Sequence, residues 1–166
     1  PALPITYNDK GKGYVLGSVR IELPTDQKFL YRIQTHYGSM DRLINDLIKP
    51  TLGKVILACG PLMTSLESVS EKRTDLIAYA TDQLNYGVYK TMVKEEETTD
   101  QLTNEIKIIR IASLITDSVS PNGYKRQEES PFAYYGLKVS QLSISDMEYE
   151  QATIDQINKQ READMS

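Results

Sequence analysis

The stretch from residue 39 to residue 59, SMDRLINDLIKPTLGKVILAC, decides the fold class of this chain. Its apolar residues recur every three or four positions, which is the spacing of one buried stripe on an amphipathic helix. Ser39 can cap this helix, and Asp41 lies where a carboxylate stabilises the positive end of the helix dipole. Pro50 predicts a kink or a restart, because proline lacks an amide donor and clashes with the preceding turn. The stripe contains Met40, Leu43, Ile44, Leu47, Ile48, Leu52, Val55, Ile56 and Cys59.

Strands are expected upstream of this helix. Residues 14–23 alternate apolar and polar side chains, which is the period of a half-buried strand, and Pro24 ends the run because proline cannot donate to a ladder. Residues 28–35 alternate again and predict the second strand of a hairpin. Residues 1–9 carry two prolines and little pattern, which indicates a lead-in segment without regular structure.

Downstream, the pattern predicts a second helix, a last strand and a final helix. The second helix is expected over residues 70–86, with Gly87 in the position that commonly follows a helix end. The last strand is expected over residues 137–145, where apolar residues alternate again. The final helix is expected from residue 146 onward.

A β-hairpin is predicted between the second helix and the last strand. Residues 88–94 and 105–115 are rich in valine and isoleucine, and residues 95–100 are polar enough to form a solvated tip. In the second of these strands the apolar phase shifts between residues 108 and 109. The shift indicates either a β-bulge or a strand that is covered on both faces.

Length and composition fit one globular domain. The chain has 166 residues, of which 40% are apolar, and its formal net charge of −4 argues against a general nucleic-acid binder. No apolar run reaches the roughly 18 residues that a membrane-spanning helix needs. Cys59 is the only cysteine, so an internal disulfide framework and a multi-cysteine metal site are excluded.

Sequence motifs for catalysis are absent, and we expect no enzymatic activity. The chain has no phosphate-binding glycine loop, no dinucleotide fingerprint and no metalloprotease or nucleophile-elbow motif. Its single histidine, His36, is expected at the surface or in a cap, and Cys59 is expected to be an inert core thiol. The carboxylates of residues 95–100 lack the spacing of a calcium loop. No catalytic, cofactor-binding or metal-binding residue is therefore assigned.

The last helix carries the one candidate contact site. Ile154 and Ile157 form a narrow apolar seam, followed by Arg161 in a stretch that is polar on nearly every face. So narrow a stripe holds a short helix only weakly to a core. We therefore expect the natural chain to continue, with Ile154, Ile157 and Arg161 as an oligomer contact that is incompletely covered in an isolated monomer.

The order of these segments is similar to that of a known family. Residues 17–20, GSVR, resemble the family's opening strand, and the leucine-rich stripe with its internal Pro50 resembles its first helix. Residues 142–146, LSISD, and residues 160–163, QREA, resemble its last strand and the Glu/Ala-rich helix that follows. The family is the SPFH or band 7 family, which contains stomatin, prohibitin and flotillin. Residues 89–132 form a longer insertion than a compact member needs, so the subfamily is left open.

The resemblance implies an α+β fold, with a small antiparallel or mixed sheet, two or three packed helices and a projecting C-terminal helix. It implies an SPFH domain over residues 1–147 and the start of a longer, coiled-coil-forming helix over residues 148–166. The implied function is a membrane-associated scaffold that forms large homo-oligomers and organises membrane microdomains or regulates membrane proteins, proteases among them. Membrane lipid would be reached through segments outside this chain, which would itself be soluble.

Two other classes of function stay open. One is an enzyme with a site near the loop of residues 116–132, which a deep pocket with converging polar groups would favour. The other is a soluble ligand- or peptide-binding module, which an apolar cavity and a last helix folded back on the domain would favour. A projecting last helix without a deep pocket would favour the scaffold.

Overall fold

The computed structural model describes residues 2–70, 72–99 and 103–165. The strands are β1 (Leu3–Thr6), β2 (Lys12–Glu22), β3 (Thr91–Thr99), β4 (Ile106–Leu114) and β5 (Lys138–Tyr149). The helices are α1 (Gln27–His36), α2 (Met40–Leu43), α3 (Lys49–Cys59), α4 (Ser65–Val69), α5 (Arg73–Tyr86), α6 (Pro131–Tyr134) and α7 (Gln151–Met165).

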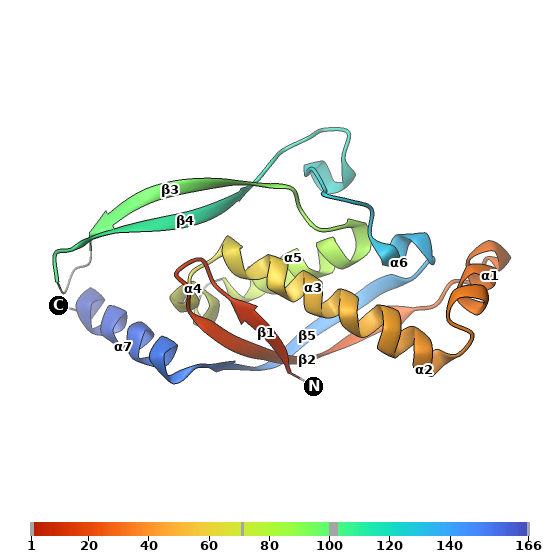
Figure 1. Ribbon diagram of the computed structural model, residues 1–166, viewed down its shortest axis with the longest axis horizontal. Coiled ribbons are helices and arrows are strands. Elements are labelled where there is room, and N and C mark those ends of the chain that lie inside the picture. Colours follow the sequence, from red (N-terminus) through yellow and green to blue (C-terminus); the bar gives the residue numbers. More distant parts are fainter. Residues whose placement is uncertain (1, 71, 100–102, 166) are drawn as a thin grey trace.

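The predicted α+β class is confirmed. The larger sheet is antiparallel and has the strand order β1-β2-β5, while β3 and β4 form a separate two-stranded sheet. Figure 1 shows α3 and α5 side by side on one face of the larger sheet, with α3 contacting β1 and α5 contacting β5. The hydrophobic core therefore lies between these two helices and the sheet.

The helix expected from residue 40 to residue 59 is present in three consecutive parts. α2 is followed by a π-helical turn, Ile44–Ile48, and then by α3. The Ser39 hydroxyl caps the start, where it accepts a hydrogen bond from the Arg42 amide at 3.2 Å. Pro50 lies in the first turn of α3, directly after the π turn, whose wider spacing accommodates the interruption that proline imposes. The predicted interruption at Pro50 is confirmed in this form.

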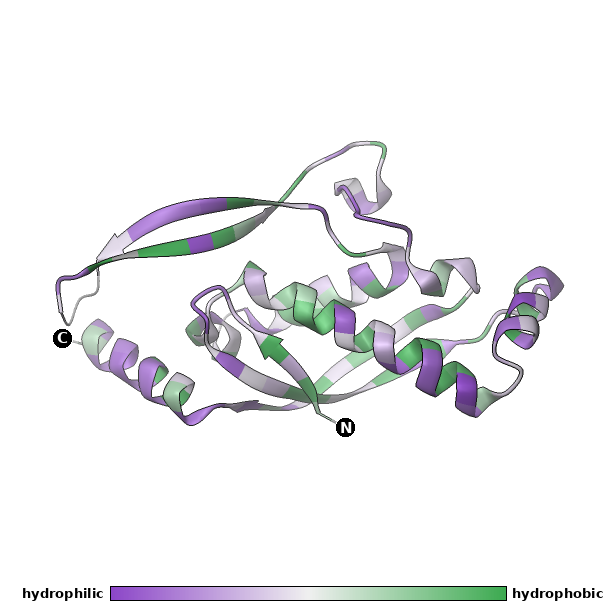
Figure 2. Cartoon of the chain, viewed as in Figure 1, coloured by the Kyte–Doolittle hydropathy of each residue, from purple (hydrophilic) through white to green (hydrophobic). Residues whose placement is uncertain are grey.

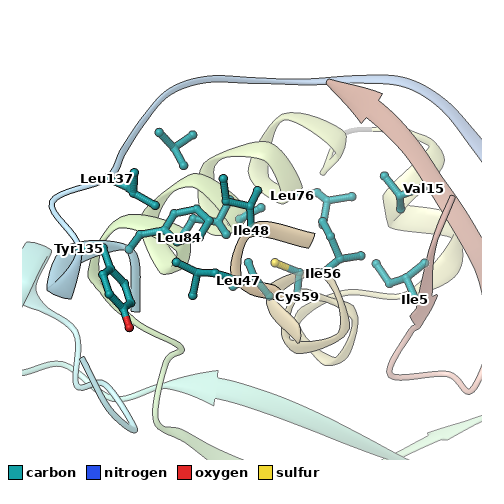
Figure 3. Packing of buried hydrophobic residues seen from close by; sticks show 14 of the residues in the cluster. Ile5, Val15, Leu47, Ile48, Ile56, Cys59, Leu76, Leu84, Tyr135 and Leu137 are labelled. Atoms are coloured by element: carbon teal, nitrogen blue, oxygen red, sulfur yellow. The ribbon is translucent and has the colours of Figure 1, made fainter. Parts of the chain in front are cut away.

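The apolar stripe of this helix packs into the core over most of its length. Figure 3 shows Ile56 and Cys59 in one cluster with Leu84 of α5 and Ile5 of β1. Met40 is the exception, since it lies in the first turn and is 50% exposed. The stripe residues that are 8% exposed or less are Leu43, Leu47, Ile48, Val55, Ile56 and Cys59.

Residues 3–6 form an edge strand, so the expected unstructured lead-in is wrong for them. β1 pairs antiparallel with Lys12–Val15 of β2. Pro4 obscures this strand in the sequence, but an edge strand tolerates a proline whose missing donor faces away from the ladder. The end of α3 packs closely on β1, because a Cβ at Gly60 would lie 2.0 Å from the Thr6 carbonyl oxygen.

The hairpin strand expected over residues 28–35 is wrong, because this segment is helix α1. Asp26 starts the helix, since its carboxylate accepts a hydrogen bond from the amide two residues on at 2.9 Å. Phe29 and Ile33 fit both structures, because positions four apart share a face in a strand and in a helix. Tyr31 lies between them and is 72% exposed, so the three side chains do not share one buried face.

The second helix is confirmed as α5, and the last strand and helix are present with a later boundary. β5 continues to Tyr149 because it pairs with β2 along its whole length. α7 consequently begins at Gln151 instead of residue 146. The Thr153 hydroxyl accepts a hydrogen bond from the Lys12 amide at 3.0 Å, which ties the first turn of α7 to β2. Beyond this tie α7 extends past the end of the sheet (Figure 1).

We expect Leu47→Ala and Ile56→Ala each to lower the free energy of unfolding by about 2–5 kcal/mol, because each empties a buried aliphatic site. Leu57 is the matched control on the same helix, since it is 48% exposed. Leu57→Ala should cost about 1 kcal/mol or less. Chemical denaturation measures all three, and equal small costs would place the stripe outside the core.

Candidate functional site

The β3–β4 hairpin is the part of the fold that the core covers least. It leaves the end of α5 and extends toward the α7 end of the molecule (Figure 1), and β4 approaches the body at the turn Gly60–Leu62. Its residue pairs run from Thr91 with Leu114 to Thr99 with Ile106 without a register shift. The predicted hairpin is therefore confirmed.

Two details of the predicted hairpin are wrong. Residues 95–99 belong to β3 rather than to a solvated tip, and Asp100 lies outside the described residues. The phase shift of the isoleucines in β4 reflects neither a bulge nor two covered faces. Ile106 and Ile108 lie on a face that is exposed, while Ile109 and Ile111 lie on the other face and are half-buried.

The exposed face of the hairpin carries three large aliphatic side chains. Alternation places Val93 of β3 on the same face as Ile106 and Ile108 of β4. Their exposed fractions are 63%, 68% and 65%. The cross-strand ion pair of Glu95 and Arg110, at 3.4 Å, lies between Val93 and the two isoleucines. Ile106 and Ile108 are therefore the neighbouring exposed aliphatic side chains on this face, and exposed apolar surface of this kind is typical of an interaction site.

The two long edges of the hairpin differ in charge. β3 carries three consecutive glutamates, Glu95 to Glu97, whereas the sequence of β4 contains Lys107 and Arg110 and no carboxylate. Figure 2 shows the same contrast, with a largely hydrophilic β3 beside a largely hydrophobic β4. Within the described residues each strand pairs only with the other, so both edges keep unpaired backbone groups. Open edges of this length are ready templates for another strand.

A buried ion pair anchors the base of the hairpin. Arg126, in the loop after β4, donates to Asp82 of α5 at 2.8 Å, and the two side chains are 7% and 14% exposed. Arg126 also donates to the Gly87 carbonyl at 3.0 Å and lies over the Tyr89 ring, 4.6 Å from its centroid. The Tyr89 hydroxyl donates a hydrogen bond to the Asp82 carboxylate. Burial of the Tyr89 side chain, together with this carboxylate, raises the pKa of Tyr89.

The hydrogen bonds around Asp82 involve the loop of residues 116–132, near which the alternative enzyme site is expected. The Asn122 side-chain amide donates to Asp82 at 2.5 Å, so Asp82 is shared by Asn122, Tyr89 and Arg126. These converging polar groups bond one another and join the loop to α5. In the parts of the chain that the structure describes, no group of three or more His, Cys, Asp or Glu side chains is arranged to hold a metal ion.

The three contact residues predicted on α7 have different environments. Ile157 is only 5% exposed and Ile154 is half-buried, because the helix packs against α4. The expectation of an open seam is therefore wrong for Ile157, whose side chain is already covered within one chain. Arg161 is exposed and lines a shallow depression of about 480 Å³ with Glu67 and Met165.

His36 and Cys59 have separate partners. The His36 Nδ1 atom lies 2.6 Å from the Tyr135 hydroxyl, at the contact between α1 and α6. Cys59 is fully buried and accepts a hydrogen bond from the Gln83 side-chain amide at 3.3 Å. Burial raises the pKa of the Cys59 thiol to about 12. The predicted core position of Cys59 is confirmed by this burial.

The hairpin surface was missed at the sequence level, although one signal pointed to it. The isoleucines of β4 lie on both sides of the strand, and β4 pairs with the glutamate-rich β3. Because only one side of a two-stranded sheet can lie against the core, the isoleucines on the other side are exposed. No family model, curated protein or solved structure matches this chain. Across the described residues, no helix is both long and apolar enough to cross a bilayer.

We expect Cys59 to react with a thiol reagent only as fast as the protein unfolds. The thiolate is the reactive species, and the folded protein keeps this thiol buried and protonated. Its raised pKa stabilises the folded state fully below about pH 9. That contribution is lost as the pH rises toward 12, since the unfolded chain then ionises first. Labelling kinetics across this pH range check it, and rapid labelling of the folded protein near neutral pH would contradict it.

Ile157→Ala should lower the free energy of unfolding by about 2 kcal/mol or more, because it opens a cavity between α7 and α4. Arg161→Glu should change it by about 0.5 kcal/mol or less, since this side chain is exposed. Thermal melts and hydrogen exchange of the α7 amides measure both effects. An unchanged melting temperature for Ile157→Ala would mean that Ile157 is not packed against α4 and is available for contact with another copy.

Proposed function

We propose that this chain is a non-enzymatic scaffold domain that assembles with copies of itself through the β3–β4 hairpin. The observation that carries the proposal is a hairpin of two nine-residue strands with two open edges and an exposed apolar face. A two-stranded sheet is marginally stable in water, and a third strand from another chain would complete it. Pairing with another copy would also bury Val93, Ile106 and Ile108.

The charges of the edges favour one mode of pairing. Two β3 edges together would bring six glutamates into proximity, which is destabilising. A β3 edge against the β4 edge of the next copy would instead place Glu96 and Glu97 beside a strand that holds Arg110 and no carboxylate. Such head-to-tail contacts generate closed rings or open filaments, depending on the rotation between copies.

The expected strength of one contact is modest. Each buried aliphatic side chain contributes up to about 1.5–3 kcal/mol, and each net backbone hydrogen bond about 0.5–1.5 kcal/mol. Association costs about 4–15 kcal/mol in lost rotational and translational freedom. A single hairpin contact is therefore weak, whereas a closed ring gives every copy two contacts.

The resemblance of segment order to the SPFH family supports the same proposal. The α+β class, the interrupted long helix and the C-terminal helix beyond the sheet agree with what that resemblance implies. We propose accordingly that the assembly acts at a membrane, reached through segments outside residues 1–166, and organises lipid or regulates membrane proteins such as proteases. The longer helix would begin with α7 at Gln151 rather than at residue 148, because β5 extends to Tyr149. The net charge of −4 disfavours nucleic acid as a partner.

A substitution on the exposed apolar face tests whether this face takes part in assembly. Ile108→Lys should weaken self-association, because it places a charge in the contact, while the fold is unchanged because Ile108 is already 65% exposed. Val119→Lys is the matched control, since Val119 is 89% exposed in the loop after β4. Sedimentation over a wide range of protein concentration measures both. A chain that stays monomeric at high concentration, with and without lipid vesicles, contradicts the proposal.

A charge exchange tests the head-to-tail mode. Lys107→Glu with Arg110→Glu makes the β4 edge acidic, and Glu96→Lys with Glu97→Lys makes the β3 edge basic. Each variant alone should assemble less than the natural chain, because its two edges then repel. An equimolar mixture should recover assembly, since each edge meets its opposite. Circular dichroism checks that each variant is folded, and a mixture that behaves like its separate components rules out this pairing.

A further inference from the structure

An apolar groove opens between α3 and the inner face of the larger sheet. Its volume is about 190 Å³, and its walls include Leu52 and Val55 of α3, Val19 of β2 and Leu142 of β5. Val19, Leu52 and Leu142 are only half-buried, although they pack against the core. The groove is thus an opening in the core with aliphatic walls on both sides.

The lengths of the strands explain why the core is open there. β1 pairs only with Lys12–Val15, so no strand of the described residues pairs with β2 on that side from Leu16 onward. The ladder between β2 and β5 shifts register between Leu16 and Gly17. Gly17 lines the groove and adds no side chain to fill it. Its missing Cβ is required, since that atom would lie 2.1 Å from the Ser143 carbonyl oxygen.

The groove has one charged group at its lining. Lys49, at the start of α3, is the single charged residue among the described residues that line it. Its ammonium group makes no hydrogen bond or ion pair with the described residues. By contrast Lys54, on the same helix, forms an ion pair with Glu128 at 2.5 Å. An unpaired ammonium beside an apolar groove matches a ligand with an alkyl chain and an anionic head.

We propose that this groove binds a free medium-chain fatty acid, with the alkyl chain along Val19, Leu52 and Leu142 and the carboxylate at Lys49. The volume supports a chain of this size, because dry apolar cavities of about 150 Å³ bind benzene. The site is independent of the assembly surface, which lies on the β3–β4 hairpin. It supplies the apolar cavity that a ligand-binding module needs, so the domain combines a ligand site with a scaffold.

Octanoate, octanol and hexanoate are the probes, and NMR of the methyl groups locates and quantifies binding. Octanoate should shift the methyl resonances of Val19, Leu52 and Leu142. Hexanoate should bind more weakly, by about fourfold for each methylene removed. Val19→Phe should abolish octanoate binding by filling the groove. Shifts confined to other residues, equal affinity for the two acids, or full binding by a folded Val19→Phe variant would overturn the proposal.

The role of Lys49 has its own test, which does not depend on the Val19 variant folding. Lys49→Gln should weaken octanoate binding by about threefold, the size of an exposed ion pair, and leave octanol unchanged. Lys54→Gln is the matched control and should change neither. Equal losses for octanoate and octanol would overturn the assignment of the carboxylate to Lys49.

Two further arms separate this site from its alternatives. Ile108→Lys should bind octanoate as the natural chain does, so a failure of assembly and a failure of ligand binding are distinguishable. Vesicles of anionic phospholipid should bind neither the natural chain nor Val19→Phe, because the proposed membrane contact lies outside residues 1–166 and the chain carries a net charge of −4. Vesicle binding that is lost in Val19→Phe, with no octanoate binding by the natural chain, would overturn the fatty acid in favour of a membrane lipid.

Discussion

The close packing of α3 on β1 is the contact on which the rest of the fold depends. Gly60 meets the Thr6 carbonyl so closely that any Cβ would collide, and the adjacent Cys59 is completely buried. This contact fixes the apolar stripe of residues 40–59 over the sheet. α5 can then pack beside α3 and over β5, which closes the core from the other side. The π turn before Pro50 keeps both halves of the stripe on this one buried face.

The β3–β4 hairpin extends from this core and is anchored to the rest of the protein at its base. Gly87, with a φ of +116°, turns the chain out of α5, and the Arg126–Asp82 pair then fixes where the hairpin leaves the body. Beyond that point β3 and β4 pair only with each other among the described residues. Stability and assembly are therefore separable, because the residues that hold the hairpin are buried and those that would contact another copy are exposed. The fatty-acid groove lies in a third place, where the short β1 leaves the edge of β2 uncovered.

The candidate sites were only partly accessible from the sequence. Ile154 and Ile157 were identified as apolar positions on the last helix, but an apolar seam does not state whether its own domain covers it. Packing against α4 covers Ile157, and no local pattern on α7 indicates that neighbour. Conversely, Ile106 and Ile108 were seen as part of a strand, yet their exposure depends on how far the hairpin lies from the core. The groove at Lys49 arises from a difference in strand length, which involves segments far apart in the chain.

The sequence alone determined whatever depends on neighbours within one or two turns. The helix at residues 40–59, its Ser39 cap, the interruption at Pro50 and the turn at Gly87 are local, because backbone hydrogen bonds and φ angles decide them. Tertiary structure decided the features for which two local readings were equally good. Residues 28–35 alternate as a strand does, but contacts with α6, through Arg32 and His36, hold them as a helix. Burial, exposure and open edges were likewise beyond the sequence, since each is a relation between segments that only the folded chain brings together.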